Sequence, residues 1–466
     1  MLKFDNSYAT ELPGFSAPWT PANVPRPTII KFNQSLADEL GLDAPWDASV
    51  FAGGAVPVGA QPVAQAYAGH QFGGFSPQLG DGRAVLLGEV IDRHGLRRDI
   101  ALKGSGRTPY SRGGDGKAAL GPVLREYLIS EAMHALSIPT TRTLAAAGTG
   151  ETIRRELPQP GAVLTRVAAS HIRVGTFQYF AARRETDKVR LLADYVIARH
   201  DPALREHPQR YLELLRAVAE RQASLIARWM NIGFIHGVMN TDNMTISGET
   251  IDFGPCAFME AYDPKTVFSS IDSQGRYAYG NQPLIARWNI ARLAEALLPL
   301  IDSDPDRAVE QATVVIDEFV DRYEAHWLAG VRAKLGISAA AATDDAGDRV
   351  LANDWLTLLE ANAVDFTLGW RYLADVAQAA DTTDRLSRLH DLFHARPALE
   401  AWLVRWRERA AREPMAPTDR VRAMRQTNPL YIPRNHRVEA ALDAAREGDL
   451  GPFERLLAVI THPFEE

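Results

Sequence analysis

Residues 236–254 read His-Gly-Val-Met-Asn-Thr-Asp-Asn-Met-Thr-Ile-Ser-Gly-Glu-Thr-Ile-Asp-Phe-Gly, and this stretch predicts a turn and a metal site. If Ser247-Gly248 is a two-residue turn between antiparallel strands, Asn243 lies directly opposite Asp252. Cross-strand partners have Cβ atoms about 4.5–5.5 Å apart. An amide oxygen and a carboxylate then converge at a spacing that suits a hard divalent cation. The prediction depends on this register, because a Gly248-Glu249 turn breaks the pairing.

The same stretch carries the metal-binding pattern of protein kinases, with one departure. Kinases hold Mg²⁺ with an Asn and with the Asp of a D-F-G segment. Here D-F-G stands at 252–254, and Asn243 lies nine residues before its Asp. Kinases also place a catalytic Asp two residues after a His, whereas the residue two after His236 is Val238. Valine cannot accept a proton, so either the chain is inactive or its chemistry uses another position, and Asp242 is the only nearby carboxylate.

A possible phosphate-binding pair precedes this stretch. Residues 84–91 and the segment that ends at Lys103 predict a β-hairpin, with Lys103 on the face opposite its apolar neighbour. A glycine-rich loop follows, and Gly121-Pro122 opens a helix predicted over 121–137 that carries Glu126. Protein kinases pair such a lysine and glutamate to hold ATP phosphates. From this pattern alone, a surface lysine and a solvated glutamate remain the alternative.

The chain changes character along its length. Its 466 residues suit two or three domains, or one large bilobal unit. Glycine-punctuated strand patterns dominate to about residue 185, and helical spacing of apolar residues dominates beyond it. We therefore predict an α+β fold with a β-rich part over 1–185 and a mostly helical part over 186–466. Helical patterns occur at 211–230, 285–300, 306–335, 351–380, 383–411 and 435–460, and a loop is predicted at 336–347.

Composition excludes several classes of protein. Lys+Arg is 51 and Asp+Glu is 58, which gives a formal net charge of -7 and argues against nucleic acid or an anionic membrane as a partner. No apolar run approaches the ~18–20 residues of a membrane span, and residues 1–6 show no export signal. Cys256 is the only cysteine, so an intramolecular disulfide is excluded. We expect Cys256 to be a packing residue, and we expect the protein to be located in the cytoplasm.

Several motifs together resemble one known family. They are His-Gln-Phe-Gly-Gly-Phe at 70–75, Gln-Leu-Gly-Asp-Gly-Arg-Ala at 78–84, Leu-Lys-Gly-Ser-Gly-Arg-Thr-Pro-Tyr-Ser-Arg at 102–112, His-Gly-Val-Met-Asn-Thr-Asp-Asn at 236–243, and further segments at 170–177, 428–429 and 434–436. They are similar to the selenoprotein O (SelO, also YdiU) family. Its members were regarded as pseudokinases and act as protein adenylyltransferases. The resemblance extends from about residue 64 to the end of the chain.

The resemblance implies a fold, a reaction and a set of site residues. The fold is protein-kinase-like and bilobal, with a nucleotide-binding N-terminal lobe and a C-terminal lobe that carries the catalytic and metal-binding segment. ATP binds inverted, so that its α-phosphate faces the acceptor, and AMP passes to Ser, Thr or Tyr hydroxyls of proteins with release of pyrophosphate. Asp242 is the implied base, Asn243 and Asp252 hold Mg²⁺ or Mn²⁺, and Glu126 supports Lys103. The implied nucleotide-binding residues are Gly80, Gly82, Arg83, Lys103, Asp115, Gly116, Arg166, Arg173 and Asp252.

The sequence also departs from the family and leaves alternatives open. Animal members carry a selenocysteine near the C-terminus and some relatives carry a cysteine pair. This sequence has neither, so we do not expect gating by an intramolecular disulfide. An ATP-binding pseudokinase scaffold explains Val238 but leaves Lys103 and the arginines unused, and a conventional phosphotransferase is disfavoured by Val238. The protein substrates, the choice between Mg²⁺ and Mn²⁺ and the choice between ATP and UTP remain open at this stage.

Overall fold

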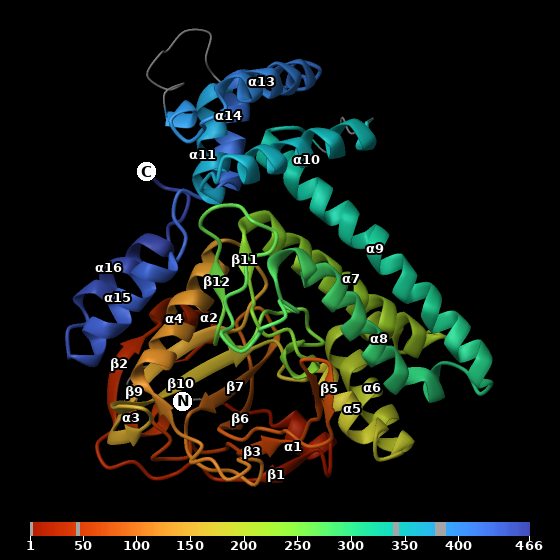
Figure 1. Cartoon of the computed structure of the whole chain (residues 1–466). Coiled ribbons are helices and arrows are strands. Elements are labelled where there is room, and N and C mark those ends of the chain that lie inside the picture. The colour runs from red at the N-terminus through yellow and green to blue at the C-terminus, as the bar shows by residue number, and fades with distance from the viewer. Residues whose placement is uncertain (1–2, 43–46, 339–343, 378–387) are drawn as a thin grey trace.

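The computed structural model describes residues 3–42, 47–338, 344–377 and 388–466. It combines an antiparallel sheet, formed by strands that all precede residue 169, with helices that make up most of the remainder (Figure 1). The predicted mixture of antiparallel strands and helices is therefore confirmed.

The main sheet has the strand order β1-β3-β6-β7-β10-β9-β2, with β8 beside β10. Neighbouring strands run antiparallel, and β6 and β7 form the predicted hairpin, in which Ala84 pairs with Lys103. Two small sheets, β4–β5 and β11–β12, lie apart from it. The strands are β1 (Ser16–Pro18), β2 (Thr28–Phe32), β3 (Val63–Gln65), β4 (Gly69–Gln71), β5 (Gly74–Ser76), β6 (Ala84–Ile91), β7 (Arg97–Lys103), β8 (Ala118–Ala119), β9 (Arg142–Arg154), β10 (Pro158–Ala168), β11 (Phe234–Ile235) and β12 (Ala257–Phe258).

Both faces of the main sheet are covered by helices, and this fixes the direction of Lys103. On one face, α2 (Gln34–Glu39) and α3 (Ala48–Phe51) share a small hydrophobic core with Leu102. On the other face, α4 (Leu120–Ala135) joins the large core that extends into the helical part of the chain. Because successive strand side chains alternate between faces, Lys103 points to the α4 side. The predicted helix over 121–137 is thus confirmed as α4, within two residues at its end.

Three long helices form the centre of the helical part. α7 (Arg210–Ile232), α8 (Gln282–Ile301) and α9 (Pro305–Leu335) pack against one another and confirm three predicted helices. Figure 1 shows α9 along the outer side of α8. The remaining helices are α1 (Ser7–Glu11), α5 (Val174–Ala181), α6 (Thr186–His200), α10 (Asp345–Ala361), α11 (Phe366–Val376), α13 (Arg396–Ala411), α14 (Pro417–Thr427), α15 (Asn435–Arg446) and α16 (Gly451–Ile460).

Helix boundaries in the last third differ from the prediction. The pattern at 351–380 divides into α10 and α11, because Asp365 caps α11 by accepting a hydrogen bond from the Leu368 N–H. The pattern at 435–460 divides at Gly448, whose φ of 96° cannot continue a helix. The predicted loop at 336–347 is too long, since α10 begins at Asp345. The helix predicted at 383–411 is shorter in the described part, where α13 begins at Arg396. Residues 339–343 and 378–387, which fall within the predictions at 336–347, 351–380 and 383–411, lie outside the described part.

The predicted strand pairing around Ser247-Gly248 is wrong. Each arm bonds to a different segment: the Ile246 N–H donates to the Ile172 carbonyl, and the Thr250 N–H donates to the Pro139 carbonyl. The Thr245 hydroxyl closes the loop between the arms by accepting from the Glu249 N–H and donating to the Glu249 carbonyl. A side chain therefore replaces the backbone ladder that the two-residue turn requires.

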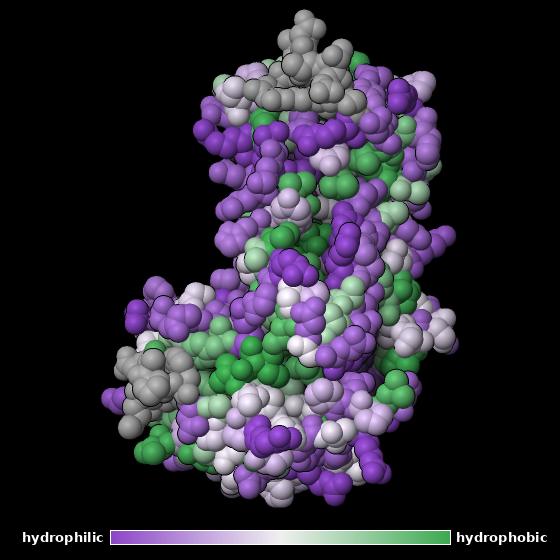
Figure 2. Space-filling view, turned by 90° about the vertical axis from the view of Figure 1, so that its left-hand side faces the viewer, coloured by the Kyte–Doolittle hydropathy of each residue, from purple (hydrophilic) through white to green (hydrophobic). Residues whose placement is uncertain are grey.

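The surface in Figure 2 is mostly hydrophilic, and apolar residues are gathered there in small separate areas. No helix in the described part of the chain has the length and apolar character needed to cross a membrane.

One buried charge in the helical core makes stability depend on pH. Burial lowers the pKa of Lys334 to about 7, and its ammonium lies 4.7 Å from the ring centre of Trp370. Between pH 7 and the ordinary lysine pKa, the unfolded chain binds more protons than the folded chain. The charged form of Lys334 therefore destabilises the folded protein fully below pH 7, and this cost decreases as pH rises. We expect Lys334→Met to raise the free energy of unfolding by about 1–3 kcal/mol at pH 6.

Urea unfolding of both proteins from pH 6 to pH 10 measures this effect. The stability gap between Lys334→Met and the parent protein should narrow as pH rises. A gap that stays constant or widens contradicts the assignment of a depressed pKa to Lys334.

Candidate active site

A cavity of about 480 Å³ lies where the sheet meets the turn that carries Asp242 and Asn243. Its lining comes from segments far apart in sequence, including the loop before β6, the end of β7, α4, β10 and the D-F-G segment. The structure brings all of the site residues predicted from the sequence to this one cavity: Gly80, Gly82, Arg83, Lys103, Asp115, Gly116, Glu126, Arg166, Arg173, Asp242, Asn243 and Asp252.

Lys103 and Glu126 form an ion pair across the β7–α4 contact. The Lys103 Nζ lies 2.5 Å from a Glu126 carboxylate oxygen, and both side chains are at most 10% exposed. The lysine also binds the Asp252 carboxylate. Its ammonium therefore sits between two acids, one from α4 and one from the D-F-G segment. The kinase-like arrangement of a strand lysine and a helix glutamate is present in the geometry.

Asp252 is surrounded by three cations. Arg166 donates to Asp252 Oδ1 at 2.7 Å, and an Arg173 guanidinium nitrogen lies 3.7 Å from Oδ2. Although burial acts to raise it, Lys103, Arg166 and Arg173 hold the pKa of Asp252 well below its usual range. The backbone of Asp252 has a φ of 63°, a left-handed conformation that costs a non-glycine residue of order 1–3 kcal/mol. The ion pairs of the side chain with three cations offset the cost of this strained backbone conformation.

Arg166 binds Asp252 directly and is itself held by a chain of buried groups. It lies on β10 directly opposite Ala101 of β7, and so faces the same side as Lys103. Its Nε donates to His171 Nε2 at 3.1 Å, and His171 Nδ1 lies 2.9 Å from an Asp99 oxygen. Burial lowers the pKa of His171 to about 4. The ring is thus neutral near pH 7, donates to Asp99 from Nδ1 and accepts from Arg166 at Nε2.

Arg173 is a buried cation with unused donor capacity. It precedes α5, and its guanidinium lies 4.3 Å from the centre of the Tyr67 ring and 3.8 Å from Asp81. Its Nε has no hydrogen-bond partner in the described chain. A buried guanidinium without a close, fully paired acid is suited to an anionic ligand such as phosphate.

Asn243 and Asp252, the predicted metal ligands, both line the cavity, although the hairpin predicted to join them does not form. The Asn243 amide nitrogen donates to the Val238 carbonyl at 3.0 Å, which leaves its oxygen as the available atom. Among the described residues, Asp252 Oδ2 has only the distant contact to Arg173, since Lys103 and Arg166 occupy Oδ1. Within the described ranges no three or more acidic, His or Cys side chains gather as a metal cluster. A site with few protein oxygens is suited to Mg²⁺, because this ion takes its remaining ligands from substrate phosphates.

Asp242 is a second acid in the cavity with a different environment. It is 8% exposed, and its Oδ1 is buried without a hydrogen-bond partner in the described chain. Burial raises the pKa of Asp242 to about 6, against the opposing effect of Arg173. The backbone of Gly69 packs against it so closely that a Cβ at residue 69 would lie 2.4 Å from the Asp242 Oδ1. Val238 also lines the cavity and offers no proton acceptor from its side chain.

Sequence reasoning missed four residues of this site. No role was assigned to them, although Tyr67 and Asp81 lie beside Arg173, His171 binds Arg166, and Asp99 binds His171. Asp81 and His171 stand inside the motifs that carry the family resemblance, so those motifs were an available signal. Asp99 and Tyr67 gave no signal, because their roles depend on contacts between β7, β10 and α5.

Comparison with known proteins identifies the family. A family model described as "Protein adenylyltransferase SelO" matches residues 1–461. A protein nucleotidyltransferase YdiU of Cereibacter sphaeroides (strain ATCC 17029) is 61% identical over 470 residues, covering 100% of this chain and 94% of the relative. One of Rhizobium johnstonii is 60% identical, covering 99% of this chain and 92% of the relative. The site belongs to a nucleotidyltransferase that acts on proteins. The chain is a member of the SelO family of protein adenylyltransferases, and ATP is the substrate that this activity implies.

The Lys103–Glu126 pair should behave as one functional unit. Lys103→Ala removes the ammonium, and Glu126→Ala removes the acid that orients it, so the double variant should be little worse than the worse single variant. We expect a coupling energy of about 1–3 kcal/mol in kcat/KM for ATP. A double-mutant cycle measures it, and strictly additive effects contradict the pairing.

His171 should position Arg166 without touching the nucleotide. His171→Phe removes the acceptor of the Arg166 Nε and the ring donor to Asp99. Arg166 keeps its bond to Asp252 and Asp99 keeps its bond to Arg199, so we expect a partial loss, with kcat/KM for ATP falling about tenfold. His171→Gln keeps one donor and one acceptor and should restore most of the activity. Equal losses in both variants, with both proteins folded by circular dichroism, would exclude this hydrogen-bonded chain as the cause.

Proposed function

We propose that this enzyme transfers AMP from ATP to Ser, Thr or Tyr hydroxyls of proteins and releases pyrophosphate. The proposal rests chiefly on the division of charge in the cavity. Lys103, Arg166 and Arg173 are buried cations that meet at Asp252. Asp242 is a separate buried acid of the same cavity, and one of its oxygens has no hydrogen-bond partner in the described part of the chain.

This division suits an inverted triphosphate. The β- and γ-phosphates carry most of the charge and are stabilised best beside the three buried cations, where bidentate arginine donors are available. The α-phosphate then lies toward Asp242. An acceptor hydroxyl that enters beside Asp242 can be oriented by its carboxylate and can pass its proton to it, while the bond between the α- and β-phosphates breaks and pyrophosphate leaves.

The pKa of Asp242 supports its role as the base. A general base works best when its pKa lies close to the working pH, and burial brings the pKa of Asp242 to about 6. Asp252 is unsuited to this role because its surrounding cations keep it ionised and occupied. Mg²⁺ or Mn²⁺, held by Asn243 and Asp252, neutralises phosphate charge when bound.

The glycine-rich part of the cavity wall is left for the part of the nucleotide beyond its phosphates. Gly82 passes so close to the Tyr110 carbonyl that a Cβ would lie 2.8 Å from it, and Gly116 would meet the Gly106 carbonyl at 2.0 Å. Only glycine permits backbone segments to pack this closely, and both glycines line the cavity. We assign Gly80, Gly82, Arg83, Asp115 and Gly116 to nucleotide binding. Arg83 and Asp115 are exposed residues of the cavity lining.

We also propose that the molecule is a protein-kinase-like, bilobal enzyme of the cytoplasm, with lobes at 1–185 and 186–466. The Lys103–Glu126 ion pair and the D-F-G position of Asp252 support the kinase-like assignment. The strands of the main sheet all fall in the first range, and α6 begins the second.

Nucleotide labelled at one phosphate tests the reaction. We expect the protein with Mg²⁺ or Mn²⁺ to acquire label, or to transfer label to added proteins, from ATP labelled at the α-phosphate but not at the γ-phosphate. The mass of each modified protein should rise by about one AMP, and pyrophosphate should appear in equal amount. The same assay with UTP labelled at the α-phosphate reports the choice of nucleotide.

Asp242→Asn is the matched control for this assay. It keeps the size of the side chain and removes the proton acceptor, so transfer should fall about 10²–10⁴-fold while ATP still binds. Label from the γ-phosphate would show a conventional phosphotransferase. Bound ATP with no label from either position would show a pseudokinase scaffold.

A further inference from the structure

The β4–β5 hairpin is bonded directly to the turn that carries Asp242. The His70 N–H donates to the Thr241 hydroxyl at 2.7 Å, and the Phe72 N–H donates to the Asn240 side-chain oxygen at 3.1 Å. The hairpin pairs with no other strand among the described residues. It is therefore held in place by the catalytic turn, and anything bound to the hairpin is brought to the acceptor side of the cavity.

The tip of this hairpin is strained and exposes aromatic rings. Phe72 and Gly73 both have positive φ, 51° and 85°, which defines the primed turn that favours Asn and Gly. A bulky residue at such a position is a genuine outlier. The Phe72 ring contacts the Tyr277 ring but remains 36% exposed, and Phe75 is 42% exposed. Packing within the chain does not account for two partly exposed rings at a strained turn, and such strain is typical of functional sites.

The start of α8 extends this apolar surface. Trp288 lies edge-on to the His70 ring, with 5.2 Å between ring centres. Leu284, one helical turn earlier on the same side of α8, is 65% exposed. Phe72, Phe75, Leu284 and Trp288 thus belong to neighbouring elements around the hairpin, and none of them lines the nucleotide cavity.

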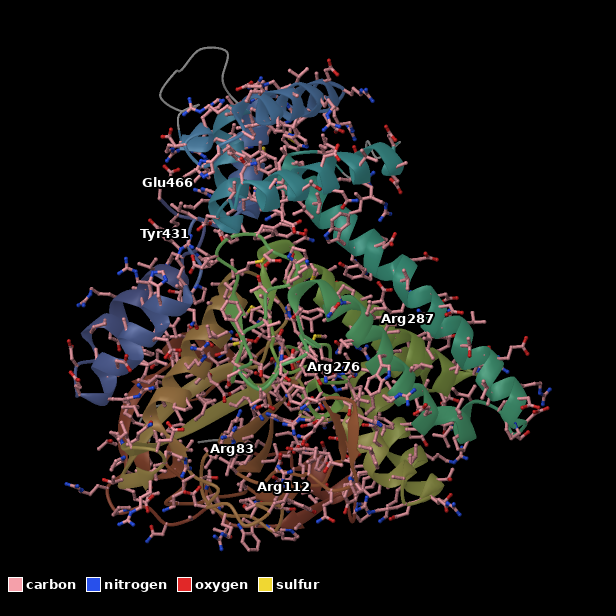
Figure 3. All side chains as sticks on the ribbon, viewed as in Figure 1. Arg83, Arg112, Arg276, Arg287, Tyr431 and Glu466 are labelled. Carbon is pink, nitrogen blue, oxygen red and sulfur yellow. The ribbon has the colours of Figure 1, made fainter. Side chains whose placement is uncertain are left out.

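Arg276 adds an unpaired positive charge to this surface. Its guanidinium lies 4.9 Å from the Trp288 ring centre and packs against Gly73, 3.5 Å from the position of a Cβ there. Figure 3 shows it next to the β5 strand. No acid in the described part of the chain lies within ion-pair distance of Arg276, and its Nε has no hydrogen-bond partner there. Arg292, on the same tryptophan, is instead paired with Glu295 at 2.8 Å.

We propose that Phe72, Phe75, Arg276, Leu284 and Trp288, here called the acceptor patch, bind the segment of the acceptor protein that carries the modified hydroxyl. The aromatic and aliphatic side chains supply apolar contact, and Arg276 selects an Asp or Glu near that hydroxyl by charge complementarity. This inference rests on the proposed function, because it concerns the protein that receives AMP. The preferred substrates are hydroxyl-bearing segments with acidic flanks.

Synthetic peptides test the charge selection. Each peptide carries one Tyr, Ser or Thr and differs only in having Asp or Lys at positions flanking that residue. With ATP labelled at the α-phosphate and with Mg²⁺ or Mn²⁺, we expect the parent protein to modify the Asp peptides about five- to tenfold faster than the Lys peptides. Arg276→Glu should reverse the order.

Arg437→Glu is the matched control, because Arg437 is an exposed arginine on α15 without an ion pair in the described chain. It should keep the preference for Asp peptides, and ATP affinity should be the same in all three proteins. The proposal for the acceptor patch is overturned if the parent protein modifies Asp peptides no faster than Lys peptides, or modifies neither. A preference for Asp peptides that survives Arg276→Glu overturns it as well. So does sedimentation that shows the parent protein as a dimer and the Arg276→Glu variant as a monomer, because the patch is then an interface between two copies of the chain. Self-modification from the same label reports separately on the proposed function.

Discussion

The ionised carboxylate of Asp252 is the feature on which the rest of the site depends. Lys103 from β7, Arg166 from β10 and Arg173 from the start of α5 all meet it. Each cation is nearly buried and would be costly without an anion. Asp252 therefore joins the sheet and the start of α5 to the D-F-G segment before nucleotide binds, and the Lys103–Glu126 ion pair adds α4. When a triphosphate enters, its oxygens can take over the same cations, so the site is preorganised for a polyanion.

The position of the second acid separates this enzyme from a protein kinase. Val238 stands where a kinase has its catalytic Asp, so no side chain there can present a hydroxyl to a terminal phosphate. Asp242 instead lies beside Asn243, with a buried oxygen that has no hydrogen-bond partner in the described chain. Two acids of one cavity thus have opposite electrostatic environments. One is held ionised by cations, and the other is shifted toward neutral pH by burial, which is how acid–base roles are usually divided.

The sequence predicted the elements that bear local signals. Alternation placed Lys103, the Gly121-Pro122 start located α4, and apolar spacing located α7, α8 and α9. The motifs gathered site residues that all line one cavity, although their roles remain predictions. The prediction of a hairpin that pairs Asn243 with Asp252 was wrong, because the Thr245 hydroxyl replaces the expected backbone bonds. The chain from Asp99 through His171 to Arg166 could not be predicted, since it depends on which strands become neighbours.

A crystal structure with Mg²⁺ and a non-hydrolysable ATP analogue tests the central claim most directly, because the claim concerns which phosphate faces which acid. The account predicts the α-phosphorus nearest to Asp242, with the β- and γ-phosphates beside Lys103, Arg166 and Arg173. A γ-phosphate next to Asp242, with the α-phosphate beside those three cations, would contradict it.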